Sequence, residues 1–152
     1  MGGADEDART LEDFEVGQVF TTQRVTVDKA DLVAFAKLYD PQPMHTDEEV
    51  AKSTFFGELM GSGWQTLGLT MRLVVEARTL GSTPLVGIAI DEVRFHRPLR
   101  PGDTLWARVE ITEVCALHSK PDRGFLRMKV NTFVGVDTPL ASLYWTLLVP
   151  RR

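Results

Sequence analysis

Hydrophobic and polar residues alternate with a period of two through most of the chain beyond Gly81. Such alternation indicates strands with one buried and one solvent-facing side. Strands are expected over 86–95, 105–117, 126–134 and 140–149. In the first of these the apolar positions change phase near Asp91-Glu92, which predicts a β-bulge. Because short polar turns separate the strands, the pattern favours an antiparallel meander.

The first half of the chain carries helical patterns after one strand, expected over 18–25. Asp28 is a good N-cap for a helix over 29–39. The pair Thr46 and Glu49 has the spacing of a capping box, which predicts that a short helix begins just after His45 and continues to about residue 53. A long helix is expected over 63–80. Its apolar residues surround most of the circumference, so we expect it to be buried on several sides.

Helices that precede a run of strands are typical of an α+β domain. One antiparallel sheet wrapped around the long 63–80 helix satisfies the pattern best. Such a sheet leaves a strand edge unpaired, and pairing of two copies removes that edge, so we expect a homodimer or a higher homo-oligomer. A single domain is expected over 11–152, with residues 1–10 disordered or loosely attached.

Composition narrows the functional classes. The 152 residues are 43% hydrophobic and 25% charged, with a net charge of −4. That charge argues against a nucleic-acid partner, and no apolar run is long enough for a membrane span. The acidic N-terminus is unlike a signal peptide. Cys115 has no second cysteine to pair with, so we expect a cytoplasmic protein. No cluster of potential ligands has zinc-like spacing, so no metal is expected.

The strongest candidates for catalytic residues lie in the segment Tyr39-Asp40-Pro41-Gln42-Pro43-Met44-His45. Pro41 keeps Asp40 out of helical conformation, so Asp40 ends one helix and His45 begins the next. A carboxylate at a helix C-terminus opposes the helix dipole, which suggests a role other than stability. Two interpretations remain open from spacing alone. The residues are a common turn with an incidental histidine, or they are an acid–base pair that faces one small molecule. The Phe55-Phe56 pair fits either the core or the lining of an apolar tunnel.

Two stretches together resemble the MaoC-like dehydratases and (R)-specific enoyl-CoA hydratases, which have the hotdog fold. Residues 40–47, Asp-Pro-Gln-Pro-Met-His-Thr-Asp, are similar to that family's Asp-x-Asn-Pro-x-His-x-Asp motif. Residues 93–105, Val-Arg-Phe-His-Arg-Pro-Leu-Arg-Pro-Gly-Asp-Thr-Leu, are similar to its strand-and-turn signature. One departure is Gln42, where the best-known hydratases have asparagine.

The resemblance implies a hydro-lyase without a cofactor, whose substrate is a coenzyme A thioester. It implies that Asp40 and His45 activate the water that adds to a trans-2-enoyl group and gives an (R)-3-hydroxyacyl product. The amide of Gly63 would stabilise the charge on the thioester oxygen, with the hydroxyl of Ser62 either assisting or capping the helix. Two alternatives stay open: a hotdog thioesterase and a non-catalytic acyl-binding subunit. Four basic residues are either phosphate ligands or solvated surface charges: Arg94, Arg97, Arg100 and Lys120.

Overall fold

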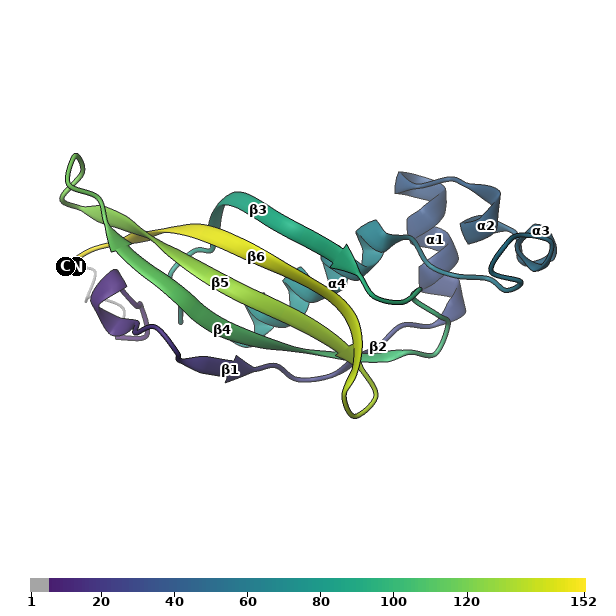
Figure 1. Cartoon of the computed structure of the whole chain (residues 1–152), viewed down its shortest axis with the longest axis horizontal. Coiled ribbons are helices and arrows are strands. Elements are labelled where there is room, and N and C mark those ends of the chain that lie inside the picture. The colour runs from purple at the N-terminus through teal and green to yellow at the C-terminus, as the bar shows by residue number, and fades with distance from the viewer. Residues whose placement is uncertain (1–5) are drawn as a thin grey trace.

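The structure is a computed structural model that describes residues 6–152. Its helices are η1 (Leu11–Asp13, a 3-10 helix), α1 (Lys29–Tyr39), α2 (Pro43–Thr46), α3 (Glu48–Lys52) and α4 (Gly63–Glu76). Its strands are β1 (Val19–Thr21), β2 (Val25–Thr26), β3 (Val86–Phe95), β4 (Thr104–Ala116), β5 (Arg123–Val134) and β6 (Thr138–Pro150). Figure 1 shows a long twisted sheet, with α4 beside it and α1 to α3 gathered at one end.

The strands form one antiparallel sheet in the order β1-β4-β5-β6-β3, and β2 also pairs with β4. The expected meander is correct for β4, β5 and β6. It is wrong for β3, which pairs with β6 and not with its neighbour in sequence. The connection between β3 and β4 is no tight hairpin, because residues 96–103 lead from the edge strand β3 to β4, which lies beyond β6 and β5 in the sheet. The bulge predicted near Asp91-Glu92 is confirmed by a register shift between Asp91 and Arg94.

Alternation along the three long strands places the core on one face of the sheet. Along β4, Leu105, Ala107, Val109 and Ile111 are fully buried, and the intervening residues are partly exposed. The same alternation runs through β5 and β6. Helix α4 contributes Leu73 and Val74 to this core. Burial of these apolar side chains is the main force that holds α4 against the sheet.

Helix α4 is less enclosed than its sequence suggests. It ends at Glu76, before the expected residue 80. Trp64 is 68% exposed, and Met71 and Val75 are also exposed, so the expectation that several sides are buried is wrong for the single chain. The sheet covers only one side of α4. Residues 6–152 leave apolar side chains exposed on its outward side.

The strand expected over 18–25 is two short strands, separated at Thr22. The Thr22 hydroxyl accepts a hydrogen bond from the backbone amide of Ala107 (2.8 Å). The Thr22 amide still donates to Ala107 O (2.9 Å), so the hydroxyl replaces only the acceptor that a backbone carbonyl would supply in regular strand pairing.

Two of the three helices at the end of the molecule, α1 and α3, begin with side-chain caps. Asp28 accepts a hydrogen bond from the Asp31 amide (2.8 Å), as the sequence predicts. The cap of α3 is Asp47, whose carboxylate accepts from the amides of Glu49 (3.0 Å) and Val50 (3.2 Å). The predicted capping box at Thr46 is therefore wrong. A carboxylate one residue later occupies the same role, and His45 lies inside the single turn of α2.

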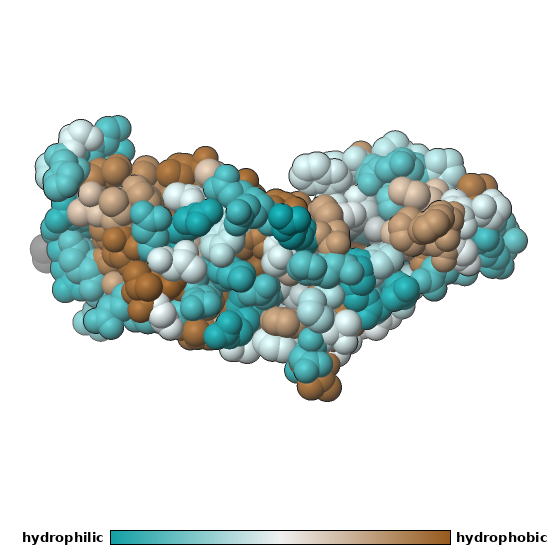
Figure 2. Space-filling model, viewed as in Figure 1, coloured by the Kyte–Doolittle hydropathy of each residue, from teal (hydrophilic) through white to brown (hydrophobic). Residues whose placement is uncertain are grey.

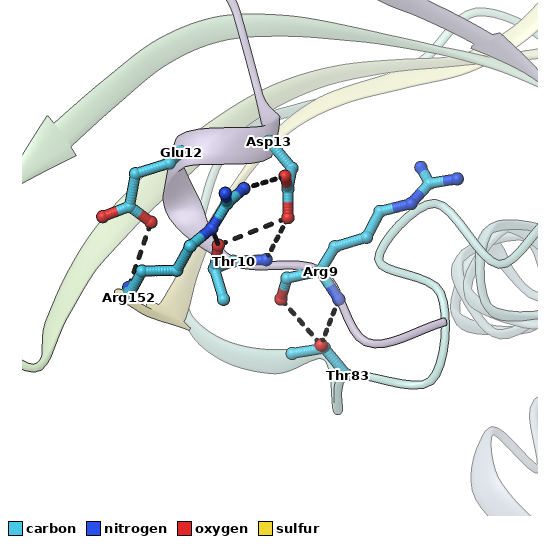
Figure 3. A network of polar contacts seen from close by, with 6 residues as sticks. All are labelled: Arg9, Thr10, Glu12, Asp13, Thr83 and Arg152. Carbon is cyan, nitrogen blue, oxygen red and sulfur yellow. Dashed lines mark hydrogen bonds and ion pairs between the residues drawn. The ribbon is translucent and has the colours of Figure 1, made fainter. Parts of the chain in front are cut away.

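The described ends of the chain meet beside η1, as Figure 3 shows. Arg152 donates to the Thr10 hydroxyl through Nε (3.1 Å) and forms an ion pair with Asp13. Arg9 exchanges two backbone hydrogen bonds with the Thr83 hydroxyl. These contacts hold residues 9 and 10, whereas the expectation for residues 1–5 lies outside the described part of the chain.

Apolar surface gathers along the free edge of the sheet. Every residue of β3 is exposed, including Val86, Ile88, Ile90 and Phe95. Figure 2 shows brown, apolar atoms along the upper edge, where β3 lies. Within residues 6–152, no helix has both the length and the hydropathy of a membrane span.

Candidate active site

A pocket of about 840 Å³ opens where the α1–α2 turn, the start of α4 and the end of β3 meet. It is lined by Asp40, Met44, His45, Phe56, Met60, Gly61, Gly63, Trp64, Thr66, Leu67, Ile90, Val93, Phe95, His96, Arg97, Pro98 and Leu99. Most of this surface is apolar. The polar side chains therefore stand out against it, as in many small-molecule sites.

Asp40 and His45 approach each other across the turn between α1 and α2. Asp40 Oδ2 lies 3.4 Å from His45 Nε2, and the side chains are 17% and 4% exposed. The turn is built around Gln42, whose backbone amide donates to Asp40 O (2.8 Å) and whose backbone carbonyl accepts from the His45 amide (2.9 Å). The two prolines stiffen this connection. The local sequence therefore brings both predicted residues to one point.

The environment of His45 fixes its tautomer. His45 Nδ1 lies 2.7 Å from the carbonyl oxygen of Met60. A carbonyl oxygen only accepts hydrogen bonds, so we assign the proton to Nδ1. In the neutral ring Nε2 then carries a lone pair, directed toward Asp40 Oδ2. Two acceptors that face each other in a pocket can share the two hydrogens of one water molecule.

Asp40 is held at both carboxylate oxygens. The Gln42 side chain donates from Nε2 to Oδ1 (2.7 Å), and the Ser62 hydroxyl donates to Oδ2 (2.7 Å). The hydrogen bond from Gln42, followed by that from Ser62, lowers the pKa of Asp40 below its ordinary value. The charge of a protonated His45 would act in the same direction, and burial opposes these effects. Asp40 is therefore a carboxylate at neutral pH.

Ser62 and Gly63 connect this pair to α4. The Ser62 hydroxyl also accepts from the Trp64 amide (3.2 Å), so Ser62 both caps the helix and holds Asp40. The predicted helix cap is therefore confirmed, the hydrogen bond to Asp40 was not predicted, and assistance at the thioester oxygen stays a prediction. Gly63 is the first residue of α4, and its amide has no partner within the helix. A Cβ on Gly63 would lie 2.8 Å from Phe95 Cζ, so a larger residue would have to displace the Phe95 ring.

The adjacent phenylalanines have different positions. Phe56 lines the pocket, whereas Phe55 is 98% exposed. A core position is therefore wrong for both phenylalanines, and a tunnel for an apolar chain stays a prediction for Phe56 alone. The other apolar walls come from α4 and from β3, whose bulge brings Val93 and Phe95 to the same pocket as Ile90.

The other two histidines and the single cysteine lie in different environments. His96 lines the pocket rim, where its Nε2 lies 2.9 Å from the Ser142 hydroxyl, and His118 is exposed. Cys115 is a free thiol. Within the described residues, no three His, Cys, Asp or Glu side chains are grouped closely enough to hold a metal ion.

Sequence reasoning missed two contributors to the site. The Met60 carbonyl that orients His45 is a backbone group, so no pattern of side chains predicts its role. Gln42 was noted only as a departure from a family pattern, although its amide reaches Asp40. An amide two residues after a candidate carboxylate was the available signal.

Comparison with known proteins identifies the family. The family model described as MaoC like domain matches residues 13–130, so the chain belongs to this family. Its antiparallel sheet around α4 is the hotdog fold, shared with MaoC-like dehydratases of known structure.

Three relatives illustrate the likeness. The chain is 35% identical to the uncharacterized protein YdeM of Bacillus subtilis, over 88% of this chain and 86% of that protein. It is 30% identical to a 3-hydroxybutyryl-CoA dehydratase of Methylorubrum extorquens, over 86% of this chain and 78% of that enzyme. The crystal structure of a MaoC-like dehydratase from Rhodospirillum rubrum superposes with a TM-score of 0.85 at 36% identity, covering 95% of this chain and 99% of that one.

Proposed function

We propose that this protein is a hydro-lyase that reversibly hydrates a trans-2-enoyl-CoA to an (R)-3-hydroxyacyl-CoA. One observation carries the proposal: Asp40 Oδ2 and His45 Nε2 face each other at 3.4 Å in an apolar pocket, beside the amide end of α4. Membership of a family that includes a 3-hydroxybutyryl-CoA dehydratase supports the reaction class.

The proposed reaction uses a water molecule held between Asp40 and His45. Asp40 removes one proton while the water oxygen bonds to C3 of the enoyl group. The electron pair of the C2–C3 double bond moves toward the thioester oxygen, and the Gly63 amide stabilises the developing charge. The proton on Asp40 passes through His45 Nε2 to C2, and the second water proton remains on the new hydroxyl. Both catalytic groups are then restored.

The test is direct. Wild-type protein with a short trans-2-enoyl-CoA is expected to remove the ultraviolet absorbance of the conjugated thioester without releasing thiol. Chiral analysis is expected to give the (R)-3-hydroxyacyl product. Thiol release with retained conjugation would instead indicate a thioesterase. Binding without either change would indicate an acyl-binding subunit.

The functional unit is proposed to be a homodimer formed through β3 and α4. Both elements expose apolar side chains, and among the described strands β3 ends the sheet and pairs only with β6. Ile90 of β3 and Trp64 of α4 are exposed although both line the pocket. Pairing of two such edges would satisfy the open backbone groups and cover the pocket walls.

A further inference from the structure

Arg97 is the one basic side chain of the four predicted candidates that lines the pocket. Arg94 is exposed on β3, and Lys120 is exposed in the β4–β5 hairpin. Arg100 forms an ion pair with Glu58. The structure therefore separates Arg97 from three surface charges that the sequence did not distinguish.

The position of Arg97 is fixed from both sides. The amide of His96 donates to Leu140 O (2.8 Å), and Leu99 O accepts from the Gly61 amide (2.7 Å). Gly61 precedes Ser62, which holds Asp40. A Cβ on Gly61 would lie 2.9 Å from Leu99 Cδ2, so the two segments are in close contact. This contact joins the Arg97 segment to the proposed catalytic turn.

Within the described residues, the Arg97 guanidinium has one distant ion-pair contact and one buried N–H without an acceptor. Its side chain is only 24% exposed, and Nη2 lies 4.0 Å from the nearest carboxylate oxygen, Asp103 Oδ1. Its Nε is buried and has no hydrogen-bond acceptor among the described residues. The other oxygen of Asp103 accepts from the Arg100 amide (2.8 Å). A buried guanidinium N–H without an acceptor is unfavourable, so a ligand oxygen at Nε would satisfy a donor that the described residues leave open.

We propose that Arg97 binds an anionic oxygen group of the thioester substrate. The planar guanidinium matches phosphate and carboxylate oxygens, and the pocket around it is otherwise largely apolar. Two parts of a substrate carry this chemistry: a phosphate of the coenzyme A carrier, or a carboxylate at the far end of the acyl group. The proposal rests on the proposed function, because it takes the thioester as the ligand of this pocket.

The experiment compares Arg97→Gln with Arg100→Gln on three enoyl thioesters. These are an enoyl-CoA, the matching enoyl-pantetheine without phosphate, and an enoyl-pantetheine with a terminal carboxylate on the acyl group. Arg97→Gln is expected to lower kcat/KM about 10- to 100-fold only for substrates with the recognised anion, which is the size expected for lost hydrogen bonds to a charged group. A loss confined to enoyl-CoA identifies the phosphate, and a loss confined to the carboxylated substrate identifies the acyl end. Arg100→Gln is expected to match wild type.

Direct binding separates this proposal from the proposed reaction. Calorimetry with the same three thioesters is performed in an Asp40→Asn background. If wild type does not hydrate the substrates but Arg97→Gln still weakens binding of a charged one, the reaction is wrong and Arg97 stands. Equal loss for the uncharged pantetheine thioester, no loss for any of the three, or no binding by the Asp40→Asn protein overturns the role of Arg97.

Thermal unfolding distinguishes ligand binding from a structural role. Arg97→Met removes the unsatisfied charge and keeps an apolar stem. It is expected to unfold at the wild-type temperature or above without ligand, and to lose the stabilisation that a charged thioester gives to wild type. A clear drop in Tm without ligand would show that the distant contact with Asp103 is structural, and would overturn the proposal.

Discussion

His45 Nδ1 lies 2.7 Å from the carbonyl oxygen of Met60, and this contact orients the imidazole toward Asp40. Met60 lies directly before the Gly61-Ser62-Gly63 segment that begins α4. Residues 60–63 therefore serve three purposes: the Met60 carbonyl directs His45, the Ser62 hydroxyl holds Asp40, and Gly63 lines the pocket. The positions of Asp40 and His45 therefore depend on how this segment packs against the α1–α2 turn.

The pair itself gives the first prediction. Asp40→Asn and His45→Gln are each expected to lower the hydration rate by about 10²- to 10⁴-fold, because each removes a proton-transfer group. The measurement is the loss of enoyl-thioester absorbance. His118→Gln changes an exposed histidine in the β4–β5 hairpin and is the matched control. Circular dichroism checks that the variants fold. Near-wild-type rates in both folded variants would exclude the pair as the catalytic groups.

Ser62→Ala is expected to reduce both stability and activity. It removes the cap of α4, which costs about 0.5–2 kcal/mol of unfolding free energy, and it frees Asp40 Oδ2. Asp28→Ala is the matched control, because it removes the cap of α1 away from the pocket. Denaturant unfolding is expected to show similar losses, whereas only Ser62→Ala lowers kcat. An equal kcat for the two variants would contradict the role of Ser62 in holding Asp40.

Gln42→Met tests the amide that holds Asp40. The hydrogen bond from Gln42 is the largest cause of the lowered pKa of Asp40, so its removal is expected to raise that pKa toward the ordinary value. Methionine keeps nearly the same length without a donor. Carbon-13 NMR of the Asp40 carboxyl over acidic pH measures the change directly, and Gln23→Met, at an exposed position, is the control.

The lowered pKa of Asp40 also determines how its contribution to the free energy of unfolding changes with pH. Because the folded pKa of Asp40 lies below its unfolded value, the contribution of this carboxylate is fully present above the unfolded pKa. It disappears as pH falls through the folded pKa. The stability difference between wild type and Gln42→Met is therefore expected to shrink in strong acid. A difference that persists unchanged there would show that Gln42 acts through packing and not through the charge of Asp40.

Much of this architecture was predictable because burial follows periodicity. The long strands alternate as expected, since one face of the sheet covers a core, and the phase change at Asp91-Glu92 correctly identified the bulge. The position of β3 beside β6 was not predictable, because no local pattern encodes which distant strand completes an edge. The exposure of α4 was not predicted either, because the sequence pattern of an apolar helix face is the same whether this chain or a second copy covers it.

The candidate site divides in the same way. Proline positions and motif spacing placed Asp40 and His45 on one turn, and the structure brings them together. Contacts between separate segments of the chain could not be predicted, including the contact of the Met60 carbonyl with His45. Arg97 could not be separated from the other cations, because charge alone does not reveal which guanidinium is buried.

The cap of α3 offers a local test of one corrected prediction. Asp47→Ala is expected to lower the unfolding free energy by about 0.5–2 kcal/mol, because the carboxylate accepts from two amides at the helix start. Thr46→Ala is the matched control and is expected to cost only a few tenths, within the usual range for residues outside such features. Chemical denaturation measures both. A larger loss for Thr46→Ala would restore the capping box that the sequence suggested.

The free edge at β3 gives the last prediction. Ile88 is 55% exposed on β3 and does not line the pocket, so Ile88→Lys places a charge on the proposed dimer edge and leaves the pocket residues unchanged. Light scattering after size-exclusion chromatography is expected to show a dimer for wild type and a monomer for Ile88→Lys, because burial of an unpaired charge is unfavourable. Val136→Lys, at an exposed position in the β5–β6 hairpin, is expected to remain dimeric. Hydration activity is expected to be lower in the monomeric Ile88→Lys variant than in the dimeric wild type, since Ile90 and Val93 of the same strand form part of the pocket wall. A monomeric wild type with full activity would show that one chain completes the pocket alone.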